Sequence, residues 1–166
     1  MAAVRPRRVL VVEDDPGITQ VLEGLLVADG LEVDATPSGL EGVVRASRGG
    51  FDLALVDIDV HDLSGLGVVR AVSDFSRLPL VVMSGREAPW RHDALRSGAT
   101  ACLPKPFDPG ALGLVVAATI AAGAVGEPWP GDVRALAPED LARLAGLAPD
   151  ELDALPFGAI RLDGAG

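Results

Sequence analysis

The amino-acid sequence predicts an α/β fold, a five-stranded parallel sheet that is doubly wound, with helices on both faces. Three observations predict it. Short apolar runs alternate five times with longer segments between residues 7 and 122. The apolar runs are rich in β-branched residues and leucine and are too short for helices, which is typical of buried strands. The longer segments carry apolar residues at helical spacing, and connections of this kind join parallel strands.

The first strand and helix show the pattern that the rest of the sequence repeats. Val9–Val12 is a four-residue apolar run. Asp15 followed by Pro16 is a typical helix start, and Asp29 with Gly30 ends the helix. We expect the later strands at 31–36, 53–56, 78–83 and 100–103, and the later helices at 38–48, 66–75, 88–97 and from 108 onward.

The last predicted helix is uncharged along its length. Asp108 and Pro109 start it, and residues 110–126 contain no charged side chain. This stretch is too short and too rich in alanine and glycine for a membrane span, which needs about 20 apolar residues. The residues expected to point away from the core are Gly113, Leu114, Ala117, Ala118 and Ala121. Because a solvent-exposed helix face normally carries charge, we hypothesise that the C-terminal segment or a second protomer covers this one.

The sequence changes character after this helix. Residues 123–137 are rich in glycine and proline and are predicted to form a linker. Residues 138–166 are predicted to form a short helical extension that ends in a strand-like segment, Phe157–Leu162. Forty-odd residues without disulfides or metal seldom fold alone.

Composition and charge exclude several classes of function. The chain of 166 residues has 24 acidic and 14 basic side chains, a formal net charge of −10, which argues against a free-standing nucleic-acid-binding protein. A single cysteine, Cys102, excludes a disulfide framework. With no signal peptide or membrane span in the sequence, we expect a soluble, cytoplasmic protein. Thirteen of the basic residues are arginines, and the exception is Lys105.

Chemically active residues follow the ends of the predicted strands. The carboxyl ends of parallel strands share one edge of a sheet, and ligands bind there. Clustered carboxylates at that edge require a cation, and oxygen-only ligands favour Mg²⁺. A hydroxyl and an ammonium group beside the metal can bind phosphoryl oxygens, and a carboxylate can accept the phosphoryl group. The residues at these strand ends are Glu13, Asp14, Asp57, Asp59, Ser84 and Lys105.

Four motifs, in order at strand ends, resemble those of the receiver domain of two-component response regulators. They are Val11–Pro16 with its acidic pair, Leu55–Asp59 with a central aspartate, Val82–Gly85 with its serine, and Leu103–Phe107 with its lysine and proline. The resemblance covers about residues 7 to 122 and implies a flavodoxin-like fold. It also implies a signalling protein and not an enzyme.

The resemblance implies a role for each residue of the site. Asp57 would accept a phosphoryl group from a histidine kinase or phosphotransfer protein, while Ser84 and Lys105 would bind the phosphoryl oxygens. Asp14 and Asp57 would ligate Mg²⁺ directly, Glu13 would act through water, and the backbone carbonyl of Asp59 would complete the protein ligands. Pro106 would follow a cis peptide bond.

The resemblance also implies the output. The face of the fourth and fifth helices and the last strand would shift on phosphorylation and contact a downstream protein or a second copy of the chain. A DNA-binding output domain is not expected, since residues 123–166 hold eight acidic residues and three arginines. The last residues, Leu155–Gly164, weakly resemble the opening strand of a PAS domain, and a generic turn after a strand is an equal alternative.

Several residues have a structural interpretation beside the functional one. Cys102 occupies the position where the family usually has an aromatic residue. In the family that ring is coupled to Ser84's counterpart, and a cysteine at this position departs from that pattern. We interpret Cys102 as a small buried strand residue and Asp15 as a helix cap. His61 is predicted to lie in a loop and His92 on a helix surface.

Two other functions remain as alternatives. One is a receiver-like interaction module that works without phosphorylation, which the absent aromatic residue favours. The other is a haloacid-dehalogenase-like phosphohydrolase, suggested by Asp57-Ile58-Asp59. That family places its Asp-x-Asp motif on the first strand, whereas here it follows the third, so this alternative is the weaker.

Overall fold

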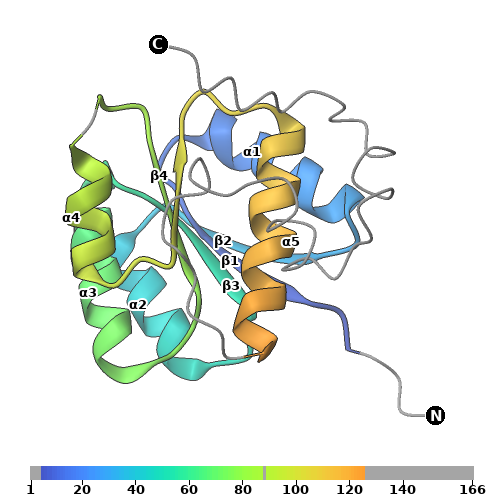
Figure 1. Cartoon of the computed structure of the whole chain (residues 1–166), viewed down its shortest axis with the longest axis horizontal. Coiled ribbons are helices and arrows are strands. Elements are labelled where there is room, and N and C mark those ends of the chain that lie inside the picture. The colour runs from blue at the N-terminus through green and yellow to red at the C-terminus, as the bar shows by residue number, and fades with distance from the viewer. Residues whose placement is uncertain (1–4, 88, 126–166) are drawn as a thin grey trace.

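The computed structural model describes residues 5–87 and 89–125, and in this range five strands alternate with five helices (Figure 1). The predicted α/β class with five parallel strands is confirmed. The elements are β1 (Arg8–Val12), α1 (Pro16–Ala28), β2 (Glu32–Thr36), α2 (Gly39–Arg48), β3 (Leu53–Asp57), α3 (Gly65–Phe75), β4 (Leu80–Ser84), α4 (Trp90–Ser97), β5 (Ala101–Pro104) and α5 (Pro109–Val125).

The strands form one parallel sheet in the order β2-β1-β3-β4-β5. The register aligns Val12 with Val56 and with Thr36, and Ser84 with Pro104. The carboxyl ends of β1, β3, β4 and β5 therefore meet at one edge. The strand order reverses between β1 and β3, and in such sheets this is the point where ligands bind.

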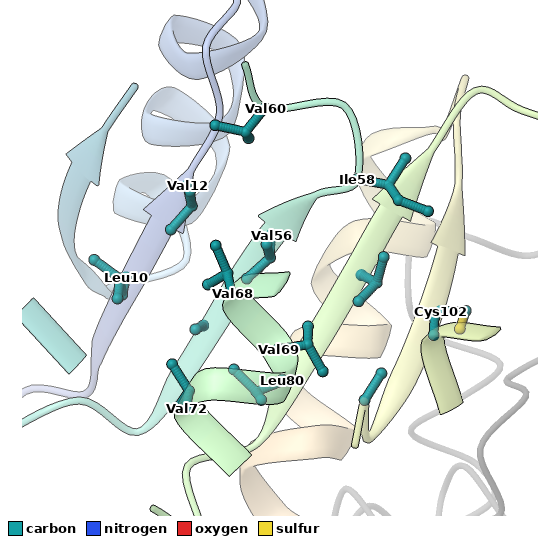
Figure 2. Packing of buried hydrophobic residues seen from close by; sticks show 14 of the residues in the cluster. Leu10, Val12, Val56, Ile58, Val60, Val68, Val69, Val72, Leu80 and Cys102 are labelled. Atoms are coloured by element: carbon teal, nitrogen blue, oxygen red, sulfur yellow. The ribbon is translucent and has the colours of Figure 1, made fainter. Parts of the chain in front are cut away.

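Alternate residues of each strand pack on opposite faces of the sheet. On one face, Leu10, Val56 and Leu80 join the side chains of α2, α3 and α4 in a hydrophobic cluster (Figure 2). On the other face, Val11 and Leu55 join the side chains of α1 and α5. Both faces are covered by helices, so the central strands are buried on both sides and their sequences are continuously apolar.

Polar side chains fix where several helices begin. Asp15 accepts hydrogen bonds from the backbone N–H groups of Gly17 and Ile18, which confirms its interpretation as the cap of α1. Asp108 accepts one from the N–H of Ala111 at 2.8 Å and so begins α5 as predicted. Caps of this kind satisfy backbone donors that have no partner inside the helix.

Three element boundaries differ from the sequence predictions by two residues or more. β4 begins at Leu80, two residues later than expected, because Pro79 has no N–H to contribute to a strand ladder. α4 begins at Trp90 without a side-chain cap. α5 continues to Val125, three residues into the predicted linker 123–137. A single glycine at position 123 costs a helix only about 1 kcal/mol, and the alanines beside it favour helix.

The exposed side of α5 is narrower than its sequence predicted. Leu114 and Ala118, expected on the outward face, are buried, whereas Ala117 is exposed. The predicted extension 138–166 and most of the predicted linker lie outside the described residues. Within the described range, no helix is long and apolar enough to cross a membrane.

Candidate functional site

Four strand ends bring the predicted site residues to the same edge of the sheet. Glu13 and Asp14 follow β1, and Asp57 is the last residue of β3. Ser84 is the last residue of β4, and Lys105 directly follows β5. The N–H of Lys105 donates to the carbonyl of Ser84 at 2.7 Å, so the lysine backbone is held against the end of β4.

Three carboxylates form an acidic cluster at this edge. Glu13, Asp14 and Asp57 each offer an oxygen within 4.8 Å of the others. Glu13 is 2% exposed and Asp57 is 4% exposed, whereas Asp14 is half-buried. Charges of one sign at this distance and depth repel each other, and a cation is the usual partner of such an arrangement.

Lys105 supplies one positive charge to the acidic cluster. Its Nζ donates to Oε2 of Glu13 at 2.7 Å and to Oδ1 of Asp57 at 3.1 Å. Burial alone lowers the pKa of the ammonium group, but the hydrogen bond to Glu13 and the charges of Asp57 and Glu13 outweigh it and raise the pKa. Lys105 is therefore charged at neutral pH and lies directly beside Asp57.

The single positive charge of Lys105 does not neutralise the acidic cluster, as the raised pKa of Glu13 indicates. Burial raises the pKa of the Glu13 carboxyl, and the nearby Asp57 raises it further. Hydrogen bonds from Lys105 and from the N–H of Asp15 act in the opposite direction without cancelling this effect. A second positive charge at this position would favour the ionised form of Glu13.

Ser84 places a buried hydroxyl at the end of β4, and its side chain and backbone both have defined partners. The residue is 0% exposed, and its Oγ accepts a hydrogen bond from the N–H of Arg86 at 3.0 Å. Gly85 separates the two residues in a tight turn. The hydroxyl proton is free to be donated to an oxygen bound at the edge of the sheet, because a hydroxyl can accept and donate at the same time.

Asp59 lies in the loop after β3, outside the acidic cluster. Its carboxylate forms an ion pair with the guanidinium of Arg86. The expected role of its backbone carbonyl as a metal ligand stays a prediction. Asp15 is also outside the cluster, in agreement with its structural interpretation.

The sequence missed the contacts of the loop between β3 and α3. His61, interpreted only as a loop residue, pairs through Nδ1 with Oδ2 of Asp14 while its side chain is 92% exposed. Asp62 accepts hydrogen bonds from the Ser38 hydroxyl and from the N–H groups of Gly39 and Leu40, so it caps α2 from a distant loop. The hydrogen bond from Ser38 and those from the backbone hold the pKa of Asp62 well below its usual range. Nothing in the spacing of the sequence indicates either contact.

A glycine allows α3 to begin against the acidic cluster. A Cβ at Gly65 would lie 2.2 Å from the carbonyl oxygen of Asp57 and 2.6 Å from Cα of Ile58. No side chain fits at these distances, and the N–H of Gly65 donates to the carbonyl of Ile58 at 3.1 Å. Gly65 therefore allows α3 to begin in direct contact with the backbone of Asp57 and Ile58.

The site as a whole fits a hard divalent cation beside a reactive carboxylate. Oxygen ligands from Glu13, Asp14 and Asp57 suit Mg²⁺ and leave positions for water or phosphate oxygens. Lys105 and Ser84 come from two further strands. The predicted cis peptide bond before Pro106 is present, and it directly follows the lysine.

Comparison with known proteins identifies the family of this chain. The sequence profile described as "Response regulator receiver domain" matches residues 9–117. The chain is 31% identical over 102 residues to the transcriptional regulatory protein CpxR homolog of Haemophilus influenzae, covering 61% of this chain and 44% of the relative. It is 36% identical over 106 residues to the transcriptional regulatory protein CseB of Streptomyces avermitilis, covering 60% and 43%. The match thus spans less than half the length of these relatives.

Solved structures show the same fold. Chemotaxis protein CheY4 of Vibrio cholerae matches with a TM-score of 0.63 at 28% identity, over 68% of this chain and 97% of that one. The receiver domain of sensor histidine kinase PA1611 from Pseudomonas aeruginosa matches with a TM-score of 0.66 at 26% identity, over 70% and 98%, and its structure has a magnesium ion coordinated in the active-site cleft. The fold, the strand-end residues and the family profile agree, and the chain belongs to the response regulator receiver domain family.

Proposed function

We propose that this receiver domain accepts a phosphoryl group on Asp57 from a histidine kinase or phosphotransfer protein and passes the signal to a protein partner. The observation that carries the proposal is the position of Lys105 Nζ, 3.1 Å from Oδ1 of Asp57 in a cluster that holds more negative than positive charge. A buried carboxylate with an ammonium group beside it is placed to react with a phosphate and to retain the product.

Each residue of the site has a part in this reaction. Glu13, Asp14 and Asp57 would hold Mg²⁺, with the backbone carbonyl of Asp59 as a further ligand. The metal ion, when bound, neutralises the carboxylates and the phosphoryl oxygens. One oxygen of Asp57 attacks phosphorus, the bond between phosphorus and the donor atom breaks, and the leaving group departs with that electron pair.

The residues around Asp57 would then stabilise the acyl phosphate. Lys105 would move its hydrogen bond from the carboxylate to a phosphoryl oxygen, since the carboxylate oxygen it contacts lies beside the reacting one. Ser84 would donate its hydroxyl proton to another phosphoryl oxygen. The added charge and acceptor oxygens favour one arrangement of the loops after β4 and β5.

The output is proposed to be a contact with another protein. The face formed by α4, β5 and α5 would bind a downstream partner or a second copy of this chain. Ala117 is exposed on α5, and residues 110–121 of that helix carry no charge, which suits an apolar contact. We expect no direct binding of nucleic acid or membrane by this domain and a cytoplasmic location. Phosphorylation would be a stoichiometric modification of the chain without turnover of a substrate.

A direct test is the mass of the protein after incubation with Mg²⁺ and acetyl phosphate, a small phosphoryl donor. We expect one phosphoryl adduct in the wild-type chain and none in Asp57→Asn. Asp59→Asn is the matched control, because it removes a nearby carboxylate outside the cluster and should keep the adduct. No adduct on the wild-type chain would favour an interaction module that works without phosphorylation. Rapid hydrolysis of varied phosphomonoesters would favour the phosphohydrolase alternative.

A further inference from the structure

Arg86 joins three parts of the molecule at the start of the loop between β4 and α4. Its N–H donates to Oγ of Ser84 at 3.0 Å. Its carbonyl accepts a hydrogen bond from Nε1 of Trp90 at 2.9 Å. Its guanidinium pairs with the carboxylate of Asp59 in the loop after β3. The backbone of this one residue therefore connects the buried hydroxyl of the site to the indole of α4.

Trp90 is the first residue of α4 and is firmly packed. It is 5% exposed and belongs to the same hydrophobic cluster as Ala94 and Cys102. Cys102 lies on β5 at the border of this cluster (Figure 2). The strand β5 itself, Ala101–Pro104, carries no aromatic ring. Trp90 is thus the aromatic side chain that links the site edge to the packing of α4.

We propose that Trp90 is a positioning residue for the Ser84 hydroxyl, acting through the backbone of Arg86, and that this connection couples phosphorylation of Asp57 to α4. The proposal rests on the proposed function, because it assigns a route for the signal that phosphorylation would produce. It gives Arg86 a role through its two backbone groups, and it predicts that the Arg86 side chain is dispensable for the route.

The physical reason lies in the geometry of the two peptide groups that flank Arg86. The N–H bonded to Ser84 and the carbonyl bonded to Trp90 belong to the same residue, so a rotation of the turn that carries one also reorients the other. When Ser84 Oγ shifts toward a phosphoryl oxygen, the N–H of Arg86 that donates to it shifts as well, and the turn that holds Arg86 adjusts. The indole then either follows its acceptor or loses it, and a buried N–H without a partner is costly.

Coupling of this kind is reciprocal. If the phosphoryl group changes the surroundings of Trp90, then removing the indole N–H must change how readily the site retains the phosphoryl group. A purely structural tryptophan would affect the stability of α4 in both states equally. The two roles therefore differ in a measurable way.

Fluorescence is the first test. The chain has two tryptophans and no tyrosine, so Trp129→Phe leaves Trp90 as the single emitting residue. We expect the emission of Trp90 in this variant to change when acetyl phosphate and Mg²⁺ produce the adduct on Asp57, and not when Mg²⁺ is added alone. A full adduct in the mass spectrum with unchanged emission would overturn the coupling while leaving the proposed function intact. No adduct would count against the proposed function itself.

Matched variants separate the positioning role from packing. Trp90→Phe keeps a ring in the cluster and removes the N–H, and Arg86→Ala removes the pair with Asp59 and keeps both backbone bonds. We expect phosphorylation to slow backbone hydrogen exchange in α4, Trp90–Ser97, of the wild-type chain and of Arg86→Ala. In Trp90→Phe we expect that change to shrink about three- to tenfold, the effect of one hydrogen bond. An equal response in Trp90→Phe and wild type would contradict the proposal.

Discussion

The two ends of the sheet each carry a group of charged side chains, and their balance is opposite. At the carboxyl edge, the acidic cluster sets three carboxylates against the single ammonium of Lys105. At the amino edge, one carboxylate, Asp52, is shared by the guanidinium groups of Arg5 and Arg7. The first arrangement has more negative than positive charge, whereas the second surrounds the carboxylate of Asp52 with donors.

The amino edge is built for stability. Asp52 also accepts the N–H of Arg8 at 2.8 Å, so the residue before β3 is tied to the first residue of β1. Its side chain is 7% exposed. Burial works to raise the pKa of Asp52, but hydrogen bonds from Arg8, Arg7 and Arg5 outweigh it and lower the pKa. Folding therefore favours the ionised form of this carboxyl.

The carboxyl edge has the opposite energetics, since folding raises the pKa of Glu13 and disfavours its charge. A cluster that served stability alone would be expected to resemble the one around Asp52. The surplus of negative charge instead suits a divalent cation, and that cation would in turn attract the oxygens of a phosphoryl group. In this fold the carboxyl pKa is lowered at the amino edge and raised at the carboxyl edge, which agrees with a structural role for Asp52 and a functional role for the cluster around Glu13.

The largest effect is expected from substitution of Asp57, which should remove phosphorylation without lowering the stability of the fold. Asp57→Asn should abolish the phosphoryl adduct. It should leave the free energy of unfolding without Mg²⁺ within about 0.5 kcal/mol of wild type or raise it, because it removes one of three repelling charges. Intact mass and urea unfolding measure the two quantities. A strongly destabilised Asp57→Asn protein would mean that the carboxyl edge is a structural cluster after all.

The mirror-image change is Asp52→Asn at the amino edge. It weakens hydrogen bonds to a buried, charged acceptor, and we expect it to lower the free energy of unfolding by about 1.5–3 kcal/mol. The adduct on Asp57 should form as in wild type when the protein is folded. Unchanged stability in urea would show that the arginines at this end contribute little. Glu32→Gln, which affects an exposed pair with Arg8, is the control and should change stability by less than about 1 kcal/mol.

Mg²⁺ should stabilise the protein through the carboxyl edge of the sheet and not through the amino edge. We expect the ion to bind the folded cluster and not the unfolded chain, in which case a concentration 100 times the dissociation constant should stabilise the protein by about 2.7 kcal/mol. Asp14→Asn should reduce this gain, and Asp52→Asn should keep it. Thermal unfolding with and without the ion measures both. Equal stabilisation of wild type and Asp14→Asn would place the ion elsewhere.

The smallest effects expected are two pH dependences of opposite sign, measured without Mg²⁺. The pKa of Asp52 lies below its ordinary value of 3.8 when folded, so its contribution is present above that pH and is lost as the pH falls through the folded pKa. The pKa of Glu13 lies above its ordinary value of 4.5, so stability falls as the pH rises from there through the folded pKa. In a plot of the free energy of unfolding against pH, Asp52→Asn should reduce the slope below pH 3.8. Glu13→Gln should reduce the slope above pH 4.5.

The sequence was most informative where chemistry follows a strand. A parallel sheet places the carboxyl ends of all its strands at one edge, so the sequence alone predicted which side chains lie close together there. These are Glu13, Asp14, Asp57, Ser84 and Lys105. Asp15 and Asp108 could be recognised as caps because their hydrogen bonds are local.

Contacts between loops were beyond the sequence. The pair of His61 with Asp14, the cap that Asp62 provides for α2 and the three-way contact of Arg86 all join segments whose separation in the chain carries no periodicity. Leu114 and Ala118 were placed on the wrong side of the core boundary because helical spacing does not tell how wide a buried face is.

The surplus negative charge of the carboxyl edge is proposed to serve acyl phosphate formation on Asp57. Borohydride reduces an acyl phosphate to the alcohol with release of phosphate, so it marks the acceptor permanently. After incubation with Mg²⁺ and acetyl phosphate, reduction and proteolysis, mass spectrometry of the peptide that contains β3 should find homoserine at position 57 and an unmodified Asp59. Homoserine at another carboxylate, or at none, would contradict the account.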